Sequence, residues 1–67
     1  MNYNTPIFIR LHSAGVEGMI NVQYITGITS YTDMITHIHM TDRDEPLCVD
    51  ESYAEIKKKL LNVAIIL

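Results

Sequence analysis

A helix start signal at residues 52–55, Ser-Tyr-Ala-Glu, constrains the fold more than any other local feature of this chain. The Ser52 hydroxyl can accept a hydrogen bond from the backbone N–H of Glu55, and the Glu55 carboxylate can accept one from the N–H of Ser52. Asp50 and Glu51 place negative charge just before this start, where the helix dipole favours it. The pattern predicts one C-terminal helix that begins near residue 53.

The apolar residues that follow this cap have the spacing of a single helical face. They are Tyr53, Ile56, Leu60, Val63, Ala64 and Leu67. Lys57, Lys58 and Lys59 are expected to lie mostly on the opposite side. The helix is therefore predicted to be amphipathic, with its apolar face packed on the rest of the protein.

The sequence before the helix alternates apolar and polar residues with a period of two, which is typical of half-buried strands. In the first such run, residues 7–12, Ile7, Ile9 and Leu11 fall on one face. The same reasoning predicts further strands at 19–22, 23–32, 33–40 and 47–49.

Glycine and acidic residues mark the breaks between these strands. Gly15 and Gly18 indicate a turn over residues 13–18, and Gly27 indicates a bend or bulge inside the third strand. Residues 41–46, Thr-Asp-Arg-Asp-Glu-Pro, have the composition of a solvated turn.

These elements predict an α+β protein, a small antiparallel β-meander of four to five strands covered by one C-terminal α-helix. With 67 residues, we expect a single domain over 1–67. A chain of this size buries only about 60% of its unfolded surface. The one cysteine, Cys48, cannot form an internal disulfide, so oligomerisation is the remaining common way to add buried surface.

The charge balance argues against partners that need clustered basic residues. The formal net charge is -3 and the sequence pI is about 5.4. Nucleic acids and anionic membranes both demand clustered Lys and Arg. The N-terminus lacks a signal-peptide pattern, and the apolar residues 60–67 fall short of the ~20 that span a bilayer. We expect a cytoplasmic protein without membrane insertion.

The motif His-Ile-His at residues 37–39 could be the beginning of a metal site. Residues two apart on a strand point the same way, so His37 and His39 could reach one ion. Asp42 and Asp44 could add oxygen ligands, and His12 could join if the first and fourth strands were neighbours. The alternative is that both histidines lie on a strand surface facing solvent or an interface, and we favour this interpretation.

Cys48 and the tyrosines could carry chemistry, but a structural role is favoured for each. A cysteine within Leu-Cys-Val is expected to be a small buried hydrophobic residue rather than a nucleophile. The sequence has no glycine-rich phosphate loop, no nucleophile elbow and no His-Glu-x-x-His motif. Tyrosines could stack on nucleic-acid bases, but core or interface packing is favoured because few arginines accompany them. We therefore expect no enzymatic activity and no cofactor.

The last residues of the chain are apolar beyond what one helical face requires. Ile65 and Ile66 fall outside the core-facing spacing, and Leu67 keeps that spacing but is the last residue of the sequence. Exposed apolar groups of this kind usually find a partner surface. We predict Ile65, Ile66 and Leu67 as interface residues, with a fraying end as the alternative.

Three segments in order resemble the small FlbD-type family of flagellar and swarming-motility proteins. They are Ile-Asn-Val-Gln-Tyr-Ile-Thr-Gly-Ile at 20–28, the hairpin at 32–49 and Asp-Glu-Ser-Tyr-Ala-Glu at 50–55. The resemblance covers roughly residues 7–60 and implies a strand, a two-stranded hairpin and a capped helix. The same stretch is similar to the first half of a LytTR-type DNA-binding domain. No site residue carries over from either family.

The functional expectation is a small non-enzymatic interaction or regulatory module that associates with itself or with another protein. Two alternatives from other classes remain: a nucleic-acid-binding transcriptional regulator of LytTR type, and a metal-binding protein that uses His37 and His39.

Overall fold

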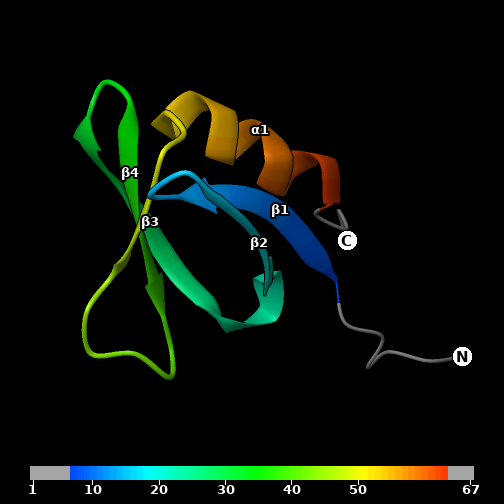
Figure 1. Ribbon diagram of the computed structural model, residues 1–67. Helices are drawn as coiled ribbons and strands as arrows, with labels where there is room; N and C mark the ends of the chain where they lie inside the picture. Colours follow the sequence, from blue (N-terminus) through cyan, green and yellow to red (C-terminus); the bar gives the residue numbers. More distant parts are fainter. Residues whose placement is uncertain (1–6, 64–67) are drawn as a thin grey trace, which may run out of the picture.

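The computed structural model describes residues 7–63, in which five strands precede one α-helix (Figure 1). The elements are β1 (Phe8–Ser13), β2 (Val16–Asn21), the short 3-10 helix η1 (Val22–Tyr24), β3 (Ile25–Thr32), β4 (Ile35–Met40), β5 (Leu47–Val49) and α1 (Tyr53–Val63). The predicted α+β class is confirmed.

The strands divide between two antiparallel sheets. β1 and β2 form a two-stranded sheet, and β3, β4 and β5 form a three-stranded sheet in that order. The pairing of β3 with β4 shifts register between Ile25 and Gly27, which confirms the predicted irregularity near Gly27. A second shift lies between Ser30 and Thr32.

The turn between β1 and β2 is shorter than the predicted turn over residues 13–18. Ser13 pairs with Val16, so only Ala14 and Gly15 form the loop. Both have positive φ, 53° and 80°, as in the type I′ turns whose twist suits a two-residue hairpin. Gly18 consequently lies inside β2, because this tight turn lets pairing resume at Val16.

The core lies between the two sheets and the helix. Its buried apolar side chains are Ile9 and Leu11 of β1, Ile38 of β4, Val49 of β5 and Ile56 of α1. The alternation predicted in β1 and β4 therefore corresponds to buried and outward-facing positions. Figure 1 shows α1 running alongside β1.

The helix begins with the predicted capping box. The Glu55 N–H donates to Ser52 Oγ over 3.2 Å, and the Ser52 N–H donates to Glu55 Oε1 over 3.1 Å. Ile56, Leu60 and Val63 pack on the core as predicted.

One expectation for the helix is wrong. Tyr53, the first residue of α1, is exposed, whereas Ile56 is buried. Lys57 and Lys58 are exposed, in line with the expectation that the lysines lie mostly opposite the apolar face, and Lys59 is the exception because its ammonium group pairs with Glu51. Ala64, Ile65, Ile66 and Leu67 lie outside the described residues. Within residues 7–63 no helix is long and apolar enough to cross a membrane.

Ala14→Gly should stabilise the protein by roughly 0.5–1 kcal/mol, because a non-glycine residue with positive φ is strained. Urea unfolding of the variant and wild type measures this difference. The matched control is Ala54→Gly within α1, which should destabilise the protein, since glycine costs up to about 1 kcal/mol in a helix. A destabilised Ala14→Gly variant would contradict the turn assignment.

Candidate functional site

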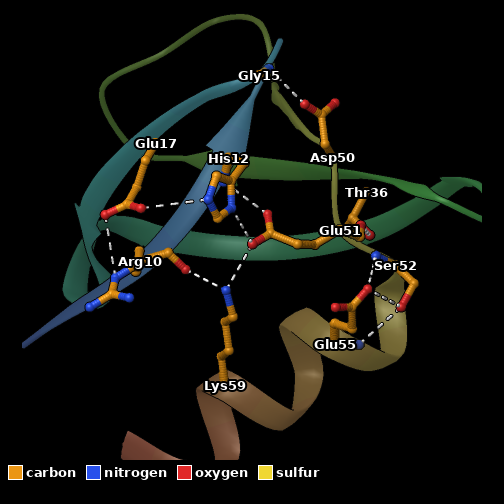
Figure 2. A network of polar contacts seen from close by, with 10 residues as sticks. All are labelled: Arg10, His12, Gly15, Glu17, Thr36, Asp50, Glu51, Ser52, Glu55 and Lys59. Atoms are coloured by element: carbon orange, nitrogen blue, oxygen red, sulfur yellow. Dashed lines mark hydrogen bonds and ion pairs between the residues drawn. The ribbon is translucent and has the colours of Figure 1, made fainter.

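The most connected polar group of the protein is the Glu51 carboxylate, which is buried between β5 and α1 (Figure 2). Its Oε1 accepts a hydrogen bond from the His12 N–H over 3.0 Å. Its Oε2 lies 2.8 Å from Lys59 Nζ and 3.3 Å from His12 Nδ1. One side chain therefore joins the first sheet to the helix.

These contacts occupy the edge of β1 that faces away from β2. Lys59 Nζ also donates to the Arg10 carbonyl over 2.6 Å, and the Asp50 N–H donates to the His12 carbonyl over 2.7 Å. Free N–H and C=O groups on a strand edge invite pairing with other strands. Here the Lys59 ammonium, the Glu51 carboxylate and the Asp50 N–H pair with the Arg10 carbonyl, the His12 N–H and the His12 carbonyl, respectively.

The neighbours of Glu51 extend the junction to the second sheet and to the hairpin turn. The buried Thr36 hydroxyl donates to the Glu51 carbonyl over 2.7 Å. Asp50 Oδ2 accepts a hydrogen bond from the Gly15 N–H over 3.0 Å, and Ser13 Oγ donates to the Cys48 carbonyl over 2.6 Å. We call the residues His12, Thr36, Asp50, Glu51 and Lys59 the junction.

Two opposing effects set the pKa of Glu51. Burial alone raises the pKa, because it penalises the charged form. The hydrogen bonds from Lys59 and from the His12 backbone and ring outweigh burial, so the pKa of Glu51 lies below its ordinary value. Glu51 is thus a charged carboxylate fixed by protein donors, and its chemistry suits a structural link.

The outer face of the β1–β2 hairpin carries a second set of charges next to the junction. Glu17 Oε2 lies 3.5 Å from Arg10 Nε, and Glu17 Oε1 lies 3.6 Å from His12 Nε2. The His12 ring therefore stands between Glu17 and the buried Glu51. Such exposed pairs each contribute little to stability, but Glu17 offsets the charge of Arg10.

A shallow groove of about 400 Å³ runs between this hairpin and the C-terminal half of α1. Its lining is Phe8, Ile9, Arg10, Met19, Lys59, Asn62 and Val63. Phe8 is 47% exposed and Met19 is 63% exposed, although both are large and apolar. The register places them on the same face of the hairpin, as diagonal neighbours.

His37 and His39 lie on the outward side of β4. They alternate with the buried residues Thr36 and Ile38, and Met40 follows His39 at the end of the strand. The ring of His37 stacks on Tyr31 with a centroid separation of 4.4 Å, and His39 Nε2 lies 3.1 Å from Thr29 Oγ1.

The other proposed metal ligands do not join this histidine pair. His12 belongs to the first sheet and contacts Glu17 and Glu51. Among residues 7–63 no three His, Cys, Asp or Glu side chains are placed to share a metal ion. The described residues therefore give the metal hypothesis no support.

The expectation that Cys48 is buried is wrong. Its thiol is exposed, because Leu47 and Val49 take the inward positions of the short strand β5. Cys48 pairs in register with His37, so it belongs to the outer face of the three-stranded sheet.

The predicted interface residues Ile65, Ile66 and Leu67 lie outside the described residues. Sequence reasoning does not predict the junction, although Glu51 and Lys59 both belong to the charge pattern around the predicted helix. Their eight-residue separation carries no signal for pairing, and His12 lies 39 positions from Glu51. The groove is not predicted either. The alternation in the first strand places Phe8 on the outward face, but it does not show that Met19 and α1 lie beside it.

Comparison of the chain with family models, with curated proteins and with solved structures finds no match in any of the three.

Glu51→Gln should lower the free energy of unfolding at neutral pH by about 2 kcal/mol, because it removes a buried, charge-assisted link. Glu45→Gln in the exposed turn is the matched control and should stay within about 0.5 kcal/mol of wild type. Urea denaturation measures both variants. Equal effects of the two substitutions would contradict the role assigned to Glu51.

The stability contributed by Glu51 should disappear in acid. A lowered folded pKa means that this contribution is fully present above the unfolded glutamate pKa of about 4.3 and is lost as the pH falls through the folded value. The difference in unfolding free energy between wild type and Glu51→Gln should shrink over that range. A difference that grows toward low pH would oppose the assignment.

Proposed function

We propose that the protein is a small non-enzymatic interaction or regulatory module that self-associates through the groove side of the β1–β2 hairpin. The observation that carries this proposal is the exposure of Phe8 and Met19 together at the groove. A large apolar side chain on a surface gains free energy when a partner covers it, at about 25 cal/mol per Å².

The charges beside the groove favour an apolar partner with little net charge. Arg10 pairs with Glu17, and Lys59 pairs with Glu51, so both cations are already neutralised within the chain. A partner with many charges would have to compete with these pairs. The same hairpin on a second copy meets the requirement, because its exposed residues are equally apolar and its charges are equally paired.

The apolar residues 65–67 extend this proposal. Val63 lines the groove, and Ile65, Ile66 and Leu67 follow it closely in the sequence. We propose that they add to the partner surface, for the second copy or for another protein. We also propose a cytoplasmic location, because the free thiol of Cys48 suits a reducing compartment.

Membership of the FlbD-type family stays a prediction from the sequence pattern, as do the DNA-binding and metal-binding alternatives. Two of the five basic residues, Arg10 and Lys59, are already paired with carboxylates. We therefore favour a protein partner over nucleic acid.

Untagged wild-type protein should sediment as a dimer or larger species at micromolar concentration. Phe8→Asp and Ile66→Asp should each weaken this association, because a carboxylate would have to be desolvated at the interface. Leu61→Asp is the matched control, since Leu61 is also exposed but does not line the groove. Sedimentation equilibrium of the four proteins measures the effect. A monomeric wild type, or association that neither Phe8→Asp nor Ile66→Asp alters, would refute the proposal.

A further inference from the structure

The hydrogen-bond pattern of the β1–β2 hairpin shows which backbone groups face outward. The Val22 N–H donates to the Ile7 carbonyl, which fixes this pair as hydrogen bonded. Hydrogen-bonded pairs alternate with non-hydrogen-bonded pairs along an antiparallel ladder. Counting from Ile7 and Val22, the pair of Ser13 with Val16 at the turn is also a hydrogen-bonded one. The N–H and C=O groups of Glu17, Met19 and Asn21 therefore point away from β1.

The outer edges of β1 and β2 differ in whether their backbone groups are hydrogen bonded. On β1, the outward groups of Arg10 and His12 meet Lys59, Glu51 and Asp50. On β2, no hydrogen bond joins the backbone of Glu17 or Met19 to another element within residues 7–63. The β2 edge is thus open in the described part of the chain.

The open edge of β2 is also regular, unlike the outer edge of β3. Every residue of β2 pairs with β1 without a register shift, whereas β3 carries two shifts. Bulges, lysines and prolines are the usual devices that protect a strand edge. Residues 16–21 contain none of these devices and only one charged residue, Glu17.

A second copy of β2 matches this edge when the two strands run antiparallel and are centred on Met19. Met19 then faces Met19 of the second copy, and Glu17 faces Asn21. This register puts the outward-facing groups of the two Met19 residues opposite one another, places the Glu17 C=O opposite the Asn21 N–H, and brings no like charges into direct opposition. The Asn21 C=O already serves as the N-cap acceptor of η1. Asn21 Oδ1 already accepts a hydrogen bond from the Gln23 N–H, which leaves the Asn21 amide donors available for Glu17 of the second copy.

We infer that two copies of this chain join along β2 in this register and form one continuous four-stranded sheet, ordered β1-β2-β2-β1. The pairing is isologous, so it closes as a dimer. Its twofold axis stands perpendicular to the sheet, and Phe8 and Met19 of both copies therefore share one face. This inference rests on the proposed self-association and moves its main contact to the edge of β2, where Met19 meets the second copy directly and Phe8 lies one strand farther away on the same face.

A charge-swap experiment at Met19 tests this register. Met19→Glu and Met19→Lys each put like charges directly opposite, and each should weaken the dimer at least about 100-fold. An equimolar mixture should form a heterodimer, because Glu then faces Lys. Sedimentation equilibrium of each variant and of the mixture gives the result, with circular dichroism to verify folding.

Met34→Glu and Met34→Lys are the matched controls, because Met34 is the same residue type, is 66% exposed and lies in the turn after β3. They should leave the dimer unchanged, alone and mixed.

A further variant, Met19→Pro, removes only an outward N–H and spares the bonds to β1. It should also yield a folded monomer.

The outcomes separate this inference from the proposed function. A wild-type dimer that the Met19 variants do not weaken, or a mixture that fails to restore association, would overturn the β2 pairing and leave self-association standing. A monomeric wild type would overturn both.

Discussion

The pairing of the buried Glu51 carboxylate with Lys59 and His12 is the interaction on which the rest of the structure depends. Among residues 7–63 no strand pairing joins the two sheets, and a chain of this size has a small core to hold them together. Glu51 contacts β1 through its carboxylate, α1 through Lys59 and β4 through its carbonyl, which accepts from Thr36. Removing the carboxylate would leave the His12 N–H without its acceptor and Lys59 with only the Arg10 carbonyl.

The same junction determines which surface the protein presents. Because it covers the edge of β1, strand addition on that side of the hairpin is blocked, whereas within residues 7–63 the edge of β2 is regular and open. Lys59 and Arg10 line the groove and also form ion pairs with Glu51 and Glu17. The ion pairs that stabilise the fold therefore also offset the positive charge of the groove. Stability and recognition thus use the same few side chains.

Local patterns predicted the elements well, because strand alternation and the Ser52–Glu55 capping box act over a few residues. The turn at Ala14 and Gly15 was predicted too long, since sequence alone does not reveal that alanine accepts a positive φ there. The junction could not be predicted, because its partners meet only after the sheets pack. Cys48 was misplaced for a related reason: three apolar residues in a row do not show which one faces outward.

The central claim is that Glu51 is a buried carboxylate held in its charged form by its partners. The most direct test is a ¹³C NMR titration of the Glu51 side-chain carboxyl in the folded protein. Pairing with Lys59 and His12 requires a pKa below the ordinary glutamate value of about 4.3. Burial without these partners would raise the pKa, so a measured value at or above the ordinary one would contradict the claim.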